Sequence, residues 1–292
     1  MASTPGPGAL FGRGVVPLLI KLICALSLLG SLGLSLGLDY FATWNWLWQL
    51  PLTFGGLWLA LTLLAFLFLL LWCLPIRLDK PVEEDSPKDR RVLSLYVDLA
   101  LSILRVKLHV TGLEQLPTDS RFVLVCNHLS ILDPVVLLSC AKKSQLAFIS
   151  KRENNSLLVV NKLMHKTLCQ LINRENDREA LLTILKCVDI IKEDKASIAV
   201  FPEGYTSKDG LLQPFRNGVF KIAQRAKVPI AVCTLQGTAE VFRNFLHLRR
   251  SHVYLNLLEV IPAEDLKGTT KEIGDRVHAD MSKILGTSVD NS

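Results

Sequence analysis

Two long apolar segments near the N-terminus most constrain how this chain can fold. Residues 22–38 and 40–76 contain no Asp, Glu, Lys or Arg. A membrane-spanning helix needs about 20 mostly apolar residues, and residues 15–38 and 53–74 supply that length. We therefore predict a two-helix membrane anchor over residues 15–76.

The basic residues around these segments predict how the anchor is oriented. Arg13 and Lys21 flank the start of the first segment, and residues 39–51 between the segments contain no Lys or Arg. Five basic residues follow the second segment: Arg77, Lys80, Lys88, Arg90 and Arg91. Because cytoplasmic flanks of membrane helices are enriched in Lys and Arg, we expect a membrane protein whose larger, C-terminal part faces the cytoplasm. The alternatives are helices that dip into one leaflet, and a cleaved signal peptide, against which the second apolar segment argues.

Small and aromatic residues fit the same interpretation. Trp44, Trp46 and Trp48 fall between the two segments, at headgroup depth if both insert. Gly33 and Gly37 lie four residues apart in the first segment. This spacing lets two helices approach closely, but glycine is common in such helices, so the pair by itself does not locate a contact.

Beyond the anchor, apolar runs typical of strands alternate with runs that keep helical spacing. The expected strands cover residues 107–111, 122–126, 146–150, 169–172, 198–201, 230–235 and 253–260. The expected helices cover residues 90–104, 133–141, 157–168, 177–192, 214–227 and 271–285. This alternation predicts an α/β fold with a largely parallel sheet flanked by helices. The expected divisions are a disordered N-terminus (1–14), the anchor (15–76), a linker (77–89) and a domain (90–292).

Composition and missing motifs exclude several function classes. The seven cysteines are scattered, odd in number and form no C-x-x-C pair, which argues against a disulfide framework or a zinc site. The net charge of +6 is not gathered in one basic block, so nucleic acid is a poor partner. The chain has no G-x-S-x-G, P-loop or H-E-x-x-H motif. We expect no metal and no cofactor.

Two short strings follow buried apolar runs. Asn127 begins N-H-L-S-I-L-D, which places His128 five residues before Asp133, and Phe201 begins F-P-E-G. Active sites of α/β domains collect at the carboxyl ends of strands. A neutral histidine is the usual general base near neutral pH, and a carboxylate that fixes its tautomer improves it. Taken alone, His128 could instead be a loop histidine and Asp133 a helix cap.

Together the two strings resemble the glycerophospholipid acyltransferase family, which is built on H-x4-D and F-P-E-G motifs. The resemblance covers about residues 104–235 and implies the α/β acyltransferase fold. It implies that His128 is the general base and that Asp133 orients it. It also implies that Glu203 and Gly204 belong to the acceptor-binding block, where Glu203 can bond a glycerol hydroxyl.

The resemblance implies further substrate-binding candidates, and at one position this sequence departs from the family pattern. In L-I-N-R-E-N, Arg174 matches an arginine that binds the acceptor phosphate, and Lys151 matches a second basic position. Either could instead be an ordinary surface ion-pair partner. The family often continues F-P-E-G-T-R-S, whereas here Thr206 stands at the arginine position. Lys208 is the candidate replacement for that charge.

The resemblance implies an enzyme that moves a fatty acyl group onto the free hydroxyl of 1-acylglycerol 3-phosphate, giving phosphatidic acid. The acyl donor, acyl-CoA or acyl carrier protein, is a co-substrate. The expected partners are therefore the lipid bilayer, a lysophospholipid acceptor and this donor. Alternatives are the same chemistry on glycerol 3-phosphate, another lysophospholipid or an amino-acid lipid, a thioesterase, and a catalytically silent membrane scaffold.

Two stretches and one thiol remain open. Residues 215–225 and 242–250 both mix bulky apolar and basic side chains. Each could lie on a bilayer surface or pack its apolar side inward. Cys126 lies two residues from His128 and is a conceivable nucleophile, but burial in its strand would make it inert.

Overall fold

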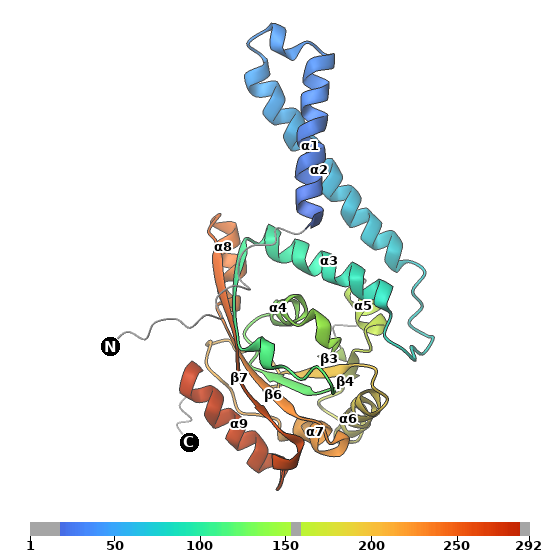
Figure 1. The fold of residues 1–292 in the computed structure, drawn as a ribbon, viewed down its shortest axis with the longest axis vertical. Coiled ribbons are helices and arrows are strands. Elements are labelled where there is room, and N and C mark those ends of the chain that lie inside the picture. The colour runs from blue at the N-terminus through green and yellow to red at the C-terminus, as the bar shows by residue number, and fades with distance from the viewer. Residues whose placement is uncertain (1–17, 153–158, 287–292) are drawn as a thin grey trace, which may run out of the picture. The chain divides into compact units, whose positions relative to one another are not determined.

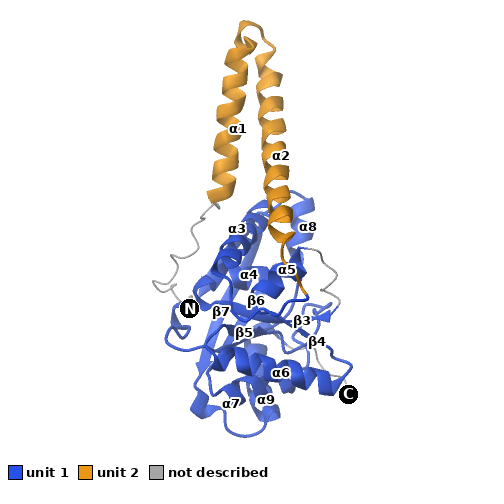
Figure 2. Ribbon diagram, turned by 90° about the vertical axis from the view of Figure 1, so that its right-hand side faces the viewer, with its two compact units in different colours: residues 1–14, 79–292 blue, residues 15–78 orange. Residues whose placement is uncertain are grey.

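The computed structural model describes residues 18–152 and 159–286, and the predicted disordered N-terminus lies outside these residues. The chain divides into two compact units, a smaller one over residues 15–78 and a larger one that holds residues 79–292 (Figure 2). The division falls close to the predicted end of the anchor at residue 76. Each unit is described by itself below.

The smaller unit is a pair of apolar helices, α1 (Leu18–Gly37) and α2 (Trp46–Cys73). Both are long and apolar enough to cross a membrane by length and composition. Gly33 and Gly37 are not at the contact between them, because a Cβ at either position would have nothing within 4 Å. The close approach lies at Gly30, where a Cβ would be 3.0 Å from Leu57 Cδ1.

A stripe of serines supports this packing. Ser27, Ser31 and Ser35 are buried in the smaller unit. The Ser27 hydroxyl donates to the carbonyl of Ile23 and the Ser35 hydroxyl to that of Ser31, both at 2.7 Å. Because each hydroxyl finds an acceptor inside its own helix, these polar groups can be buried among apolar side chains at little cost.

The larger unit is a sheet between two layers of helices (Figure 1). Within the described residues its strands are β1 (Val106–Thr111), β2 (Val123–Cys126), β3 (Leu146–Lys151), β4 (Gln170–Ile172), β5 (Ser197–Val200), β6 (Ile230–Gln236) and β7 (Ser251–Ile261). Its α-helices are α3 (Pro87–Ile103), α4 (Asp133–Cys140), α5 (Val160–Lys166), α6 (Asp177–Lys192), α7 (Lys221–Ala226), α8 (Val241–Leu246) and α9 (Thr270–Leu285). The predicted α/β class and flanking helices are confirmed.

The strand order is β1-β7-β6-β2-β5-β3-β4. All neighbouring strands pair in parallel except β6 and β7, which are antiparallel. The sheet is therefore largely parallel, as predicted, and β2 lies at its centre with β5 beside it. The carboxyl ends of β2 and β5 share one edge of the sheet.

Side-chain alternation assigns each helix layer to one face of the sheet. In β2, Val123 and Val125 belong to the core beneath α6, α7 and α9. Leu124 and Cys126 belong to the core beneath α3 and α4. A strand buried on both faces is apolar at every position, which is why this run stands out in the sequence.

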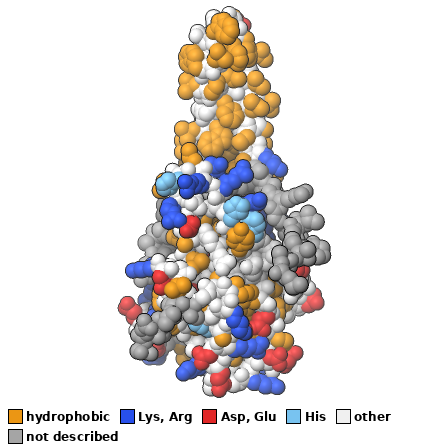
Figure 3. Space-filling view, turned by 90° about the vertical axis from the view of Figure 1, so that its left-hand side faces the viewer, with side chains coloured by type: hydrophobic (Ala, Val, Ile, Leu, Met, Phe, Trp, Pro, Cys, Tyr) orange, Lys and Arg blue, Asp and Glu red, His pale blue; other side chains and the backbone are white. Residues whose placement is uncertain are grey.

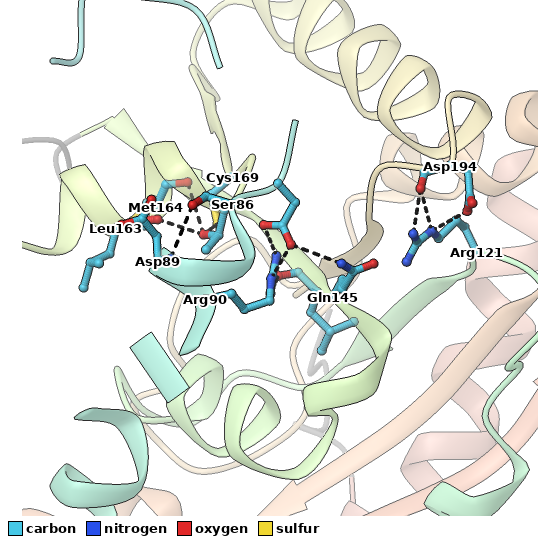
Figure 4. Close-up of polar contacts among 12 residues, drawn as sticks. Ser86, Asp89, Arg90, Arg121, Gln145, Leu163, Met164, Cys169 and Asp194 are labelled. Atoms are coloured by element: carbon cyan, nitrogen blue, oxygen red, sulfur yellow. Dashed lines mark hydrogen bonds and ion pairs between the residues drawn. The ribbon is translucent and has the colours of Figure 1, made fainter. Parts of the chain in front are cut away.

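Residues 79–89, which fall in the predicted linker, pack into the larger unit. Asp85 forms an ion pair with Arg90 at 2.6 Å, and both side chains are largely buried. The same arginine donates to the carbonyl of Leu146 at 3.1 Å (Figure 4). Ser86 caps α3 by accepting from the backbone N–H of Asp89 at 3.3 Å. These contacts tie the start of the domain to β3.

Several predicted boundaries differ from the structure. The helix expected over residues 214–227 is a 3-10 turn (Asn217–Phe220) followed by α7. The helix expected from residue 157 is described only as α5, because residues 153–158 lie outside the described ranges. The turn between β6 and β7 contains α8, a helix that the sequence did not predict.

Candidate active site

The end of β2 positions the catalytic candidates. Asn127 is buried, and its amide pairs with the backbone of Leu235 in β6, donating at 2.9 Å and accepting at 2.7 Å. Where β2 ends, the Asn127 side chain thus makes the hydrogen bonds to β6 that the backbone of a continuing strand would make. This pairing fixes the direction in which His128 leaves the sheet.

His128 is held by the carboxylate that begins α4. Oδ2 of Asp133 accepts from His128 Nδ1 at 2.8 Å and from the backbone N–H groups of Leu129 and Ser130 at 2.6 and 2.8 Å. The aspartate side chain is 0% exposed. A carboxylate in this position accepts a hydrogen bond from Nδ1–H and keeps the proton on Nδ1, so Nε2 of the neutral imidazole carries the free lone pair. The arrangement is that of a general base with its orienting group.

The other side of the imidazole is defined by residues after β5. The hydroxyl of Thr206 lies 3.3 Å from Nε2 and can donate to it. The ring of Phe201 stacks on the imidazole with centroids 4.3 Å apart. The residue at the family's arginine position therefore contacts the nitrogen that a general base uses.

Glu203 lies in the turn after β5 and reaches the backbone of His128. Its side chain is 1% exposed. One carboxyl oxygen accepts from the backbone N–H of His128 at 2.6 Å, and the other accepts from that of Gln213 at 2.9 Å. Burial raises the pKa of this carboxyl to about 7. Both oxygens accept from backbone, and one of these bonds holds the N–H of His128.

A second backbone bond completes the clamp on His128. The N–H of Ser207 donates to the His128 carbonyl at 2.8 Å. The F-P-E-G segment and the residues after it therefore hold the histidine at its N–H, its carbonyl and its ring. This gives the two motifs a shared role, although α4, β3, α5, β4, α6 and β5 separate them in the chain.

Gly204 makes room for an arginine. Its φ is +80°, and a Cβ there would lie 2.9 Å from both Cδ and Nε of Arg216. The backbone N–H of Arg216 donates to the Pro202 carbonyl at 2.7 Å. The left-handed backbone and the close approach of the Arg216 side chain both favour glycine at this position. Because Gly204 has no Cβ, the Arg216 side chain can pack against the turn.

A pocket of about 320 Å³ opens beside this turn. Its lining residues are Ile149, Ile172, Arg174, Asp177, Ala180, Ile184, Val200, Phe201, Pro202, Gly204, Arg216, Asn217, Gly218 and Val219. Phe201 relates the pocket to His128, because its ring stacks on the imidazole and the residue is part of the pocket lining. The two guanidinium groups suit a phosphate, and the apolar walls suit hydrocarbon.

The structure separates the predicted substrate-binding residues. Arg174 and Gly204 line the pocket. Lys151 ends β3 opposite Ile172 of β4. Lys208 is exposed in the loop after Ser207. Neither lysine lines the pocket. Sequence reasoning missed Arg216 as a binding candidate, because the stretch that contains it was considered only for bilayer contact. The separation of Gly204 and Arg216 in the sequence does not indicate that the two residues are in contact.

The structure also bears on two other kinds of chemistry, a cysteine nucleophile and a metal centre. Burial raises the pKa of the Cys126 thiol well above its usual range, so the thiol stays protonated and is a poor nucleophile. Among the described residues, no group of three or more His, Cys, Asp or Glu side chains could hold a metal ion.

The profile of the acyltransferase family matches residues 107–236. A chloroplast 1-acyl-sn-glycerol-3-phosphate acyltransferase of Brassica napus is 37% identical over 136 residues, 46% of this chain and 39% of the relative. A probable enzyme of the same name from Mycoplasma pneumoniae is 30% identical over 178 residues, 59% of this chain and 66% of the relative. The chain thus spans about two fifths of the plant relative's length.

A solved structure supports the same placement. The crystal structure of a 1-acyl-sn-glycerophosphate acyltransferase from Thermotoga maritima matches with a TM-score of 0.56 at 21% identity. The match covers 77% of this chain and 89% of that one, and at this identity it shows the shared fold. Sequence profile, relatives and fold agree, and the chain belongs to the glycerophospholipid acyltransferase family.

Proposed function

We propose that this protein transfers a fatty acyl group from a thioester donor to the free hydroxyl of 1-acylglycerol 3-phosphate, giving phosphatidic acid. The observation that carries the proposal is the placement of His128. Its Nδ1 is held by Asp133, and its ring stacks on Phe201, a residue that also lines the pocket containing Arg174 and Arg216. Relatives named for this reaction support the choice of acceptor.

The proposed reaction needs no protein nucleophile. The acceptor hydroxyl binds at His128 Nε2 beside the Thr206 hydroxyl and gives up its proton as its oxygen attacks the thioester carbonyl. The carbon–sulfur bond breaks, and the departing thiolate takes the proton from the imidazolium. Asp133 stabilises that imidazolium while it carries the proton. Glu203 keeps the His128 backbone in place through the cycle.

In this proposal Arg174 and Arg216 hold the acceptor phosphate. Both guanidinium groups line the pocket, and each can bind two phosphate oxygens. Arg216 then supplies the charge that Thr206 lacks, and Lys151 and Lys208 contribute at longer range. Whether the donor is acyl-CoA or acyl carrier protein is decided by assay.

The two apolar helices support a membrane location for this chemistry. A lysolipid acceptor resides in the bilayer, so an anchored enzyme meets it at high local concentration. The basic residues after the second segment place the acyltransferase domain on the cytoplasmic side in this proposal.

The proposal is tested with the purified full-length protein, labelled oleoyl-CoA or oleoyl-acyl carrier protein, and a panel of acceptors. We expect labelled phosphatidic acid from 1-acylglycerol 3-phosphate, and none from the His128→Ala protein. Product from glycerol 3-phosphate or another lysophospholipid would change the acceptor assigned to the enzyme and leave the proposed mechanism unchanged. Free fatty acid without acylated product would indicate a thioesterase, and no turnover of either donor would favour a scaffold.

The phosphate assignment has its own test. Arg216→Ala and Arg174→Ala should each raise KM for 1-acylglycerol 3-phosphate by about tenfold to a hundredfold, because each removes a charged hydrogen bond. The same variants should leave any turnover of monoacylglycerol, which has no phosphate, unchanged. Arg225→Ala is the matched control, since Arg225 lies on α7 and outside the pocket lining. An unchanged KM in Arg216→Ala would remove that residue from the site.

A further inference from the structure

The turn between β6 and β7 exposes large apolar side chains. Leu246 and Leu248 are 79% and 75% exposed, more than any other large apolar side chain in the described part of the larger unit. Phe242, one turn before Leu246 on α8, is 46% exposed. Val241 alone faces inward on this helix as a fully buried residue. Contiguous exposed apolar side chains of this size mark interaction surfaces.

Arginines surround these side chains. Arg243, Arg249 and Arg250 are exposed in the same turn, and Arg105 donates to the carbonyl of Leu248 at 2.5 Å. The acidic residue in the turn is Glu240, which pairs with Arg243 at 2.7 Å. We call the set of Phe242, Leu246, Leu248, Arg105, Arg243, Arg249 and Arg250 the α8 patch. Figure 3 views the side of the molecule on which α8 and β7 lie in Figure 1, where basic and apolar side chains gather.

The tip of the α8 patch is held in a defined conformation. Leu248 has φ of +56°, which costs a non-glycine residue conformational energy. The N–H of Leu248 donates to Phe245 at 3.0 Å, and the N–H of Arg249 donates to Asn244 at 2.8 Å. With the Arg105 bond, these contacts present an exposed leucine on a fixed backbone.

The other stretch of mixed apolar and basic residues, 215–225, packs differently. Phe220 is fully buried in the core beneath α6, α7 and α9, and Phe215 and Val219 pack against the same core. Residues 215–225 therefore turn their apolar side inward. Of these two stretches, the one over residues 242–250 leaves large apolar side chains uncovered.

We propose that the α8 patch docks on an anionic bilayer surface, with Leu246 and Leu248 among the acyl chains and the arginines at the lipid phosphates. Apolar side chains ringed by basic ones are the composition of interfacial membrane sites. Each arginine near an anionic surface increases binding several-fold. This contact is separate from the two apolar helices and holds whichever acceptor the enzyme uses.

The test places a fluorophore on the patch in the full-length protein. Leu246→Cys is labelled with NBD and reconstituted into phosphatidylcholine vesicles with and without phosphatidylglycerol, with nitroxide-labelled lipid as quencher. Leu182→Cys is the matched control, because Leu182 is 53% exposed on α6, in the opposite helix layer. Wild-type protein treated in parallel corrects for labelling of the seven native cysteines.

We expect NBD at position 246, and not at 182, to be quenched by the nitroxide lipid, with a blue-shifted emission that needs phosphatidylglycerol. Arg249→Ser with Arg250→Ser should lower the ratio of docked to undocked label about tenfold or more, as should high salt, which screens the charges. Equal quenching at 246 and 182, or none at 246, would overturn the proposal. A blue shift in detergent that rises with protein concentration would instead assign the patch to a second copy of this chain.

Discussion

At the scale of single residues, the site depends on buried carboxyl groups with unequal tasks. Asp133 uses one oxygen for the imidazole and for two backbone N–H groups. Glu203 uses both oxygens for backbone N–H groups, one of them that of His128. In the proposed mechanism the first carboxylate orients the base, and the second holds its backbone in place.

Glu203→Gln tests this division. An amide accepts at its oxygen only, so its NH2 group would face one of the two backbone N–H donors. We expect the unfolding free energy to fall by about 1–3 kcal/mol and kcat to fall with little change in acceptor KM. Chemical denaturation and steady-state kinetics measure both. A raised KM with unchanged stability would support the acceptor-binding role that the family resemblance implies for Glu203.

Thr206 gives a second prediction at this scale. Its hydroxyl lies 3.3 Å from His128 Nε2 and so beside the position of the acceptor hydroxyl. Thr206→Val should lower kcat/KM about tenfold, because a hydrogen bond at the reacting centre contributes about 1 kcal/mol or more. Thr206→Ser keeps the hydroxyl and should stay near wild type. Faster turnover by the valine variant would mean that the hydroxyl only competes with the acceptor.

At the scale of elements, the pocket depends on how α9 packs on the 3-10 turn Asn217–Phe220. Gly274 of α9 faces Asn217 and Phe220, and a Cβ there would clash with the Asn217 side chain. Asn217 also lines the pocket. A helix that approaches another element this closely needs a glycine at the contact.

Gly274→Ala should therefore lower the unfolding free energy by about 1–3 kcal/mol, the usual cost of overpacking, despite alanine's better helix propensity. The pocket wall should shift with Asn217, so acceptor KM should rise as well. Lys271→Ala, at an exposed position of the same helix, is the matched control for surface substitution. Stabilisation by Gly274→Ala would show that Asn217 can move away freely.

At the scale of the whole molecule, Glu203 makes folding depend on pH. Burial raises its pKa from 4.5 to about 7, so the folded protein binds a proton that the unfolded chain has released between these values. The contribution of Glu203 to stability is full below about pH 4.5 and is lost as the pH rises through about 7. The loss amounts to about 3 kcal/mol at most.

Denaturation measured across this range should show the slope in the wild type and a weaker one in Glu203→Gln, which has no proton to lose. Equal slopes in the two proteins would assign the pH dependence to other groups.

The sequence by itself determined the parts that depend on local pattern. The uncharged segments predicted both apolar helices, α1 close to its observed bounds but α2 from residue 53, whereas the helix begins at Trp46 and includes two of the tryptophans expected between the segments. Strands buried on both faces stood out as apolar runs, so β2 and β5 and the motifs at their ends were found together. His128 and Asp133 are near neighbours in the chain, so their hydrogen bond followed from one helix start.

Only the tertiary structure decided what depends on distant contacts. Arg216 lies across Gly204, and Glu203 reaches back to the backbone of His128, because two strands far apart in sequence end at the same edge of the sheet. The two stretches of mixed apolar and basic residues were equivalent as patterns. Packing buries Phe220 and leaves Leu246 and Leu248 uncovered. Residue type states what a side chain prefers, whereas the neighbours that satisfy it are assigned only when the whole chain has folded.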